Sequence, residues 1–309
     1  MNKSFKLLMM VCVVLLSLGA MSSASAAPAK RQITYNGKTY SVPAKTDKIV
    51  VVGALESLED ALVLNYSPLG ASTVGGKFQV LYAKITAKTV GIGEKTEPSL
   101  EKILKLKPDV ILSSTKFPAA TNAKLAKIAV TIPVSHISTD WQRNLYLLAD
   151  LTGKTKEVKA ILDQYQKDVK TAQAKVGPKF KGKTAVALRV RSGNLFVYPQ
   201  DVFFNPSLYK ELGATAPGEV LKAKAQQNIS LEQFSDINPD YIFLQFSADE
   251  NKDNPKALDE LKANPIWTSL KAVKNGNVYV NLVDPLSQGG TAYSKISFLE
   301  ALKKTNLWK

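Results

Sequence analysis

A short pattern occurs twice in this chain, 131 residues apart, and this repetition limits the folds that the chain can adopt. The stretch "PSLEKILKLKPDVILSS" (98–114) is echoed by "ISLEQFSDINPDYIFLQ" (229–245). The shared residues are Ser99, Leu100, Glu101, Pro108 and Asp109, which recur as Ser230, Leu231, Glu232, Pro239 and Asp240. Each copy places a possible helix cap before a short helix, and a Pro-Asp before a buried strand. The repeat therefore predicts two lobes of similar design.

Strand and helix patterns alternate on both sides of one long helical stretch. The first lobe, residues 27–150, contains the strands "KIVVVG" and "DVILSS" with helical segments between them, after a predicted β-hairpin at Asn36–Gly37. Residues 151–178 predict a connecting helix, which we expect to end at "GPKFKGK", and residues 179–309 repeat the alternation. The prediction is an α/β protein with two Rossmann-like lobes, a single long α-helix joining them and a ligand cleft between them.

The first 26 residues are typical of a secretory signal peptide. Lys3 and Lys6 precede an apolar run, which ends before Ala24-Ser25-Ala26. The mature chain is therefore expected to begin at Ala27 and to be exported. Cys12 is the only cysteine and lies in this segment, so we expect no disulfide and no thiol chemistry in the mature protein.

The charge balance favours an anionic partner. The formal net charge is +15, and removal of the two signal lysines lowers it to +13. Nucleic acid is disfavoured because the protein is predicted to be exported, and many lysines lie on helical segments whose polar faces would be solvated.

Several classes of site lack their usual residues. The chain has one histidine, His136, whereas zinc and manganese sites use several histidines with carboxylates. "TVGGK" lacks the spacing of a phosphate-binding loop. We expect His136 to be structural, no metal site or resident cofactor, and no enzyme; a secreted hydrolase is the distant alternative.

The order of lobe, spanning helix and lobe, with the Leu-Glu and Pro-Asp pattern in both lobes, resembles the ABC-transporter solute-binding proteins for ferric siderophores, haem and cobalamin. In that family the glutamate of each pattern docks to arginines of the membrane permease. The resemblance therefore implies docking roles for Glu101 and Glu232 and a monomer that delivers its ligand to an ABC permease. The alternative is that both acids only favour their helix N-termini.

Four cations are predicted to converge on the cleft, because ligands of open α/β sheets bind at the carboxyl ends of the strands. Lys116 follows the strand "DVILSS", Lys95 lies in the loop "GIGEKTEP", and Arg189 and Arg191 share a face of "ALRVR". Grouped cations repel one another, so their convergence favours an anionic ligand. Taken singly, each could be an ordinary surface residue.

The spacing of these cations is similar to that of the basic residues in bacillibactin and enterobactin binding proteins. Gln226 of this chain matches a polar contact of those proteins. The resemblance implies a ferric tris-catecholate ligand with three negative charges. A citrate-type siderophore is the serious alternative and haem a weaker one. Hydroxamate chelates and cobalamin carry little negative charge.

One feature departs from the family. Members from bacteria with a single membrane are usually lipoproteins with a cysteine after the apolar run, but this chain has Ala-Ser-Ala there. The expected location is the periplasm or the extracellular face of the membrane, without a lipobox cysteine.

Overall fold

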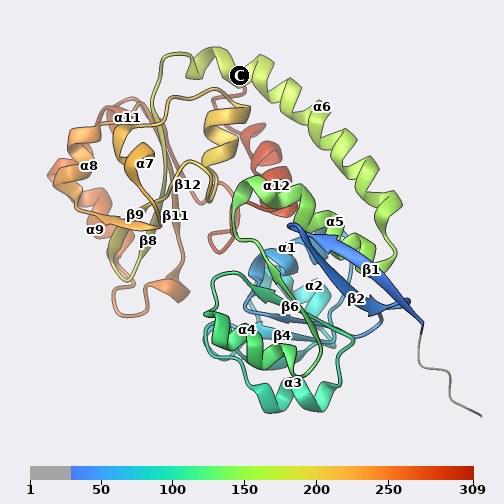
Figure 1. The fold of residues 1–309 in the computed structure, drawn as a ribbon. Helices are drawn as coiled ribbons and strands as arrows, with labels where there is room; N and C mark the ends of the chain where they lie inside the picture. Colours follow the sequence, from blue (N-terminus) through green and yellow to red (C-terminus); the bar gives the residue numbers. More distant parts are fainter. Residues whose placement is uncertain (1–28) are drawn as a thin grey trace, which may run out of the picture.

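The computed structural model describes residues 29–309, so the predicted signal peptide and Cys12 lie outside the described residues. Two five-stranded sheets, each covered by helices, form two lobes that α6 (Thr155–Phe180) connects along one side of the molecule (Figure 1). This arrangement confirms the predicted fold class. Within residues 29–309, no helix has both the length and the apolar composition that a membrane span requires.

The sheet of the first lobe is entirely parallel, with the strand order β5-β4-β3-β6-β7. Its strands are β3 (Ile49–Val52), β4 (Gly70–Thr73), β5 (Val90–Glu94), β6 (Val110–Ser114) and β7 (Val130–Val134). Its helices are α1 (Leu55–Val63), α2 (Ala83–Thr86), α3 (Leu100–Leu106), α4 (Ala119–Ala126) and α5 (Trp141–Thr152). The order reverses between β3 and β6, the point at which such sheets bind ligands.

Side chains of β3 alternate between two apolar cores. Val50 and Val52 pack with Ile103 of α3 and Leu125 of α4, whereas Ile49 and Val51 face the larger core on the other side of the sheet. Because both faces are covered, the strand is apolar throughout, as expected for a parallel sheet.

The first described elements form the predicted hairpin. Strands β1 (Lys30–Tyr35) and β2 (Lys38–Pro43) pair antiparallel, and Asn36 and Gly37 form the turn with φ angles of 46° and 74°. Positive φ at both central positions is the requirement that Asn-Gly meets.

The sheet of the second lobe is mixed, with the order β10-β9-β8-β11-β12. Strands β8 (Ala185–Arg191), β11 (Tyr241–Phe246) and β12 (Val278–Val280) pair in parallel, and β9 (Asn194–Val197) pairs antiparallel with both β8 and β10 (Gln227–Ile229). Its helices are α7 (Gly218–Lys222), α8 (Leu231–Ile237), α9 (Ala257–Ala263), α10 (Pro265–Ser269) and α11 (Lys271–Lys274).

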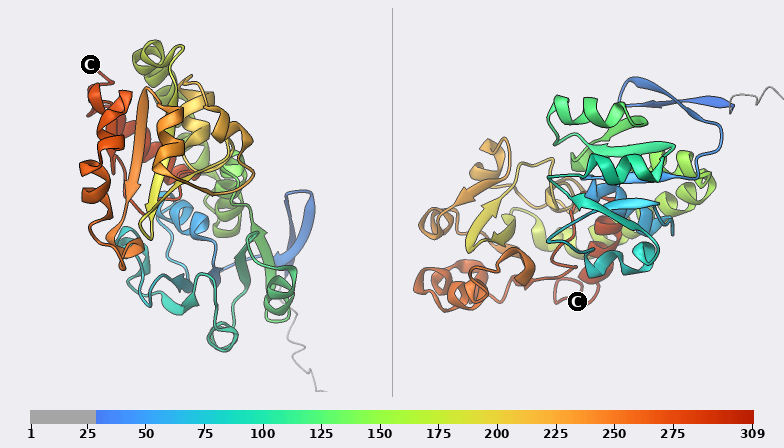
Figure 2. Two further views of the ribbon diagram at one scale, coloured as in Figure 1. Left: turned by 90° about the vertical axis from the view of Figure 1, so that its left-hand side faces the viewer. Right: turned by 90° about the horizontal axis from the view of Figure 1, so that it is seen from below.

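The last helix, α12 (Ala292–Leu302), returns to the first lobe and packs against α1 and α5 (Figures 1 and 2). One apolar core consequently continues through both lobes, from Val51 of β3 to Phe298 of α12 and Phe243 of β11. The lobes are thus joined by packed side chains as well as by α6.

Helix α6 extends past the expected stop at Gly177-Pro178. Helix α5 ends at Thr152, where Gly153 adopts a left-handed conformation, and α6 then runs from Thr155 to Phe180. Gly177 lacks the Cβ that would clash with the following proline, and Phe180 is fully buried, so the last turn stays helical.

Candidate functional site

A cavity of about 600 Å³ lies between the lobes, at the carboxyl ends of the sheet strands. Gly53 follows β3, Lys95 follows β5, Ser114 ends β6, and His136 follows β7. Arg191 is the last residue of β8 in the opposite lobe. This is the position at which open α/β sheets bind ligands.

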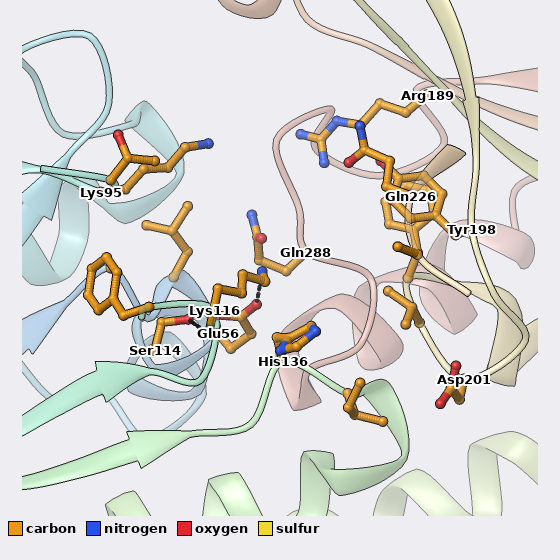
Figure 3. A pocket seen from close by; sticks show the side chains of 18 of the residues that line it. Glu56, Lys95, Ser114, Lys116, His136, Arg189, Tyr198, Asp201, Gln226 and Gln288 are labelled. Atoms are coloured by element: carbon orange, nitrogen blue, oxygen red, sulfur yellow. Dashed lines mark hydrogen bonds and ion pairs between the residues drawn. The ribbon is translucent and has the colours of Figure 1, made fainter. Parts of the chain in front are cut away.

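All five predicted cleft residues line this cavity. Lys95 and Lys116 come from the first lobe, and Arg189, Arg191 and Gln226 come from the second. Figure 3 shows Lys95 and Arg189 extending toward the space between the lobes from opposite walls.

Two carboxylates that the sequence analysis missed hold three of the four cations. The Lys116 Nζ atom lies 2.8 Å from Oε1 of Glu56, which is buried at the start of α1. The Glu250 carboxylate accepts from Arg189 Nε at 2.7 Å and from Arg191 Nη2 at 2.8 Å. These four cations face two carboxylates, and the other two charged residues of the lining, Lys224 and Asp201, offset each other, so the cleft keeps an excess of positive charge.

Lys95 differs from the other three cations, because it forms no ion pair with any residue of the described part of the chain. Burial lowers its pKa from the ordinary value, and repulsion from Arg191, Arg189 and Lys116 adds to this effect, while Glu250 opposes it. An anion bound in the cleft would relieve that repulsion.

His136 lies on the wall of the cleft, a position that was not predicted for it. Its Nδ1 atom is 2.9 Å from Oγ1 of Thr115. Burial and the nearby charge of Lys116 lower the pKa of His136, which favours the neutral imidazole at pH 7. Its position after β7 could have identified it, by the same strand-end argument that placed the cations.

Aromatic rings form part of the wall of the second lobe. The rings of Tyr198 and Phe203 are stacked, with centroids 4.4 Å apart, and the Arg189 guanidinium carbon lies 5.9 Å from the Phe203 centroid. Both rings are largely buried, so they form an apolar part of the wall beside the arginine.

Gly53 permits a close contact at the floor of the cleft. Its φ is +69°, and a Cβ at this position would lie 2.4 Å from the Phe117 ring and 2.7 Å from the Lys95 carbonyl oxygen. Any larger residue would therefore displace the segment that carries Lys95.

Glu101 and Glu232 lie on α3 and α8, at the outer ends of the two lobes (Figure 1). Both are exposed. Ser99 and Ser230 cap the two helices, and Ser230 forms a capping box with Gln233. Glu101 pairs with Lys105 at 2.6 Å, whereas Glu232 forms no ion pair within residues 29–309.

A family model described as periplasmic binding protein matches residues 28–281. The iron-uptake system-binding protein of Bacillus subtilis is 52% identical over 282 residues, which cover 91% of this chain and 89% of that protein. The Fe(3+)-citrate-binding protein YfmC of the same organism is 32% identical over 266 residues, covering 84% of this chain and 81% of that protein.

A solved structure gives a similar fold. The triscatecholate siderophore binding protein FeuA of Bacillus subtilis, complexed with ferri-bacillibactin, matches with a TM-score of 0.85 and 54% identity. The match covers 88% of this chain and 96% of FeuA.

Proposed function

Because the chain belongs to the periplasmic binding protein family, we propose that it is the extracytoplasmic solute-binding component of an ABC importer for an anionic ferric siderophore. It would bind a ferric tris-catecholate between its lobes and deliver it to the permease. It is a binding protein and not an enzyme.

The observation that carries this proposal is the convergence of Lys95, Lys116, Arg189 and Arg191 on one cavity, against two carboxylates. Six catecholate oxygens carry six negative charges, and Fe(III) neutralises three, so the complex is a trianion. A cleft with excess positive charge suits such a ligand. The sequence identity of 54% to a triscatecholate siderophore binding protein supports the same ligand class.

The chief alternative is a citrate-type ferric siderophore, because a relative named for Fe(3+)-citrate is 32% identical. Two observations favour the catecholate. The protein named for a triscatecholate is more similar to this chain, and the aromatic residues Tyr198 and Phe203 line the cavity beside Arg189. Haem, the weaker alternative, would use an axial ligand such as Tyr or His.

Glu101 and Glu232 would dock the two lobes to the permease, with the protein acting as a monomer on the outer side of the membrane. Both side chains are exposed, one on α3 of the first lobe and one on α8 of the second, which supports this role. Each exposed ion pair contributes only about 0.2 to 1 kcal/mol, so recognition would require both contacts and the surrounding shape.

Quenching of tryptophan fluorescence during titration tests the ligand class. The ligands would be a ferric tris-catecholate, ferric citrate, a ferric hydroxamate, haem and cobalamin. We expect the tightest binding with the tris-catecholate. Tight binding of the hydroxamate or cobalamin without a response to the tris-catecholate would refute the proposal, and preference for ferric citrate would keep the site but change its ligand.

A further inference from the structure

Glu250 contacts both cleft arginines although it is not among the described residues that line the cavity. Its Oε2 accepts from Arg189 Nε at 2.7 Å, and its Oε1 accepts from Arg191 Nη2 at 2.8 Å. The Glu250 side chain is only 11% exposed. The carboxylate therefore holds the two guanidinium groups from behind the wall of the cleft.

The backbone around Glu250 is fixed to the end of β8. Glu250 lies in a short 3-10 turn, Ala248–Glu250, whose first residue follows the cap Ser247. The Ser192 N–H donates to the Glu250 carbonyl at 2.9 Å, and Asn251 Nδ2 donates to the Val190 carbonyl at 3.0 Å. These bonds link the turn to the strand that carries both arginines, so the position of the carboxylate is defined.

The bridge has two opposite effects on a bound anion. It orients two long, flexible side chains that would otherwise repel each other, and orientation lowers the entropic cost of binding. It also places a negative charge near the cleft, which would repel an anionic ligand. Removing the carboxylate would therefore tighten binding if its charge mattered more, and weaken binding if its positioning of the arginines mattered more.

The remaining contacts of the arginines indicate that positioning is the larger effect. Arg189 Nη2 donates to the Pro285 carbonyl at 3.3 Å, and Arg191 Nη1 donates to Gln226 Oε1 at 3.1 Å. Neither contact involves a second carboxylate, so Glu250 is the one charged partner of both arginines among the described residues. Charge-assisted hydrogen bonds are stronger than neutral ones, so the bond to Glu250 is the strongest hydrogen bond of each arginine.

We propose that Glu250 is a positioning residue, which holds Arg189 and Arg191 in the orientation that binds the anionic ligand. This proposal rests on the proposed function. Its effect on the ligand passes through the two arginines. Loss of its carboxylate consequently weakens binding, even though the cleft becomes more positive.

The test compares dissociation constants for ferri-bacillibactin in the unsubstituted protein, Glu250→Gln and Asp253→Asn. Asp253 is exposed in the same loop and forms no ion pair within residues 29–309, so Asp253→Asn makes the same charge change without touching the arginines. We expect Glu250→Gln to bind at least about tenfold more weakly and Asp253→Asn to stay within about twofold. Equal or tighter binding by Glu250→Gln would overturn the proposal.

A double-mutant cycle separates positioning from a general structural effect. In an Arg189→Ala, Arg191→Ala background, Glu250→Gln should cause no further loss of affinity. A further loss equal to that in the unsubstituted protein would contradict a role through the arginines.

Glu250→Asp replaces Glu250→Gln if thermal unfolding shows that Glu250→Gln is not folded. We expect weaker binding by Glu250→Asp because the shorter carboxylate cannot reach both arginines. Unchanged binding would overturn the proposal. Failure of the unsubstituted protein to bind ferri-bacillibactin would refute the proposed function instead.

Discussion

At the scale of single residues, the cations of the cleft could be predicted because their positions follow from strand ends. Lys116 and Arg191 come at or just after hydrophobic runs, and parallel strands bring such positions to one edge of a sheet. Glu250 could not be predicted in this way. It is separated from Arg191 by 59 residues, and neither spacing nor alternation indicates that the two pair.

Arg191 is the residue whose loss should affect the ligand most directly. It contacts Gln226 and Glu250, and its buried Nε has no hydrogen-bond partner among the described residues. Removing one partner of a charged pair in a partly desolvated site typically costs about 2 to 5 kcal/mol, because the opposing charge stays unpaired. Arg191→Ala should therefore weaken binding of a ferric tris-catecholate at least tenfold, which is about 1.4 kcal/mol.

Arg143→Ala is the matched control for this substitution. Arg143 is exposed on α5, outside the cleft, where it pairs with Asp140. Fluorescence titration should give this variant the affinity of the unsubstituted protein. Similar affinities for Arg191→Ala and Arg143→Ala would remove Arg191 from the site.

At the scale of elements, the two halves of the repeated pattern have different roles. The Asp109 carboxylate accepts from the Lys48 N–H at 2.9 Å, and the Asp240 carboxylate accepts from the Thr184 N–H at 3.0 Å. Each aspartate thus ties its segment to the residues that precede the central strand of its lobe, β3 or β8. The sequence showed that the pattern repeats, but only the structure shows that its Pro-Asp half stabilises the fold.

Asp240→Ala should lower the free energy of unfolding by roughly 1.5 to 3 kcal/mol, because hydrogen bonds to a charged group are lost. Burial acts to raise the pKa of Asp240, but bonds from Lys271 and the Thr184 N–H outweigh it and lower the pKa. Denaturant unfolding would measure the loss, with Asp236→Ala, an exposed acid on α8, as the control. Equal stability of the two variants would contradict this role.

The contact between α1 and α12 should make stability depend on pH. Burial raises the pKa of Glu59 to about 7, although its carboxylate accepts from Ser294, Thr291 and the Gln288 N–H. A carboxyl whose pKa is higher in the folded state binds more protons when folded, so its contribution to stability falls as pH rises from about 5 to about 7.

Glu59→Gln should therefore gain stability relative to the unsubstituted protein as the pH rises from 5 to 8. The glutamine can still accept from the Gln288 N–H and donate to the two hydroxyl oxygens. Denaturant unfolding of both proteins at several pH values measures the difference. A difference that does not change with pH would show that Glu59 does not titrate in this range.

At the scale of the whole molecule, the chain order of two lobes and one spanning helix could be predicted, but the path of α12 could not. Its sequence continues the alternation of the second lobe, yet Phe298, Leu299 and Leu302 belong to the core shared by both lobes. Such a choice between two apolar surfaces depends on tertiary packing, which a local pattern does not contain.

Docking is also a property of the whole molecule, because Glu101 and Glu232 lie on different lobes. Glu101→Arg combined with Glu232→Arg should abolish uptake of the ferric siderophore by cells, since both contacts with the permease become repulsive. The affinity for the ligand should not change, because both residues lie outside the cleft. The control is Glu157→Arg combined with Glu300→Arg, which changes two exposed acids on α6 and α12. Normal uptake by the Glu101→Arg, Glu232→Arg variant would remove the docking assignment.

The central claim is that the charge of the cleft selects a trianion, and varying ligand charge at constant shape tests it most directly. One tris-catecholate would be loaded with Fe(III), Ga(III) or Ti(IV). The iron and gallium complexes each carry three negative charges, and the titanium complex carries two. Dissociation constants would be measured at one low and one physiological salt concentration, because screening weakens the effect of charge. We predict similar affinities for the two trivalent complexes, and binding of the titanium complex weaker by about tenfold at low salt and by less at physiological salt. Titanium binding equal to or tighter than iron binding at low salt would contradict the claim.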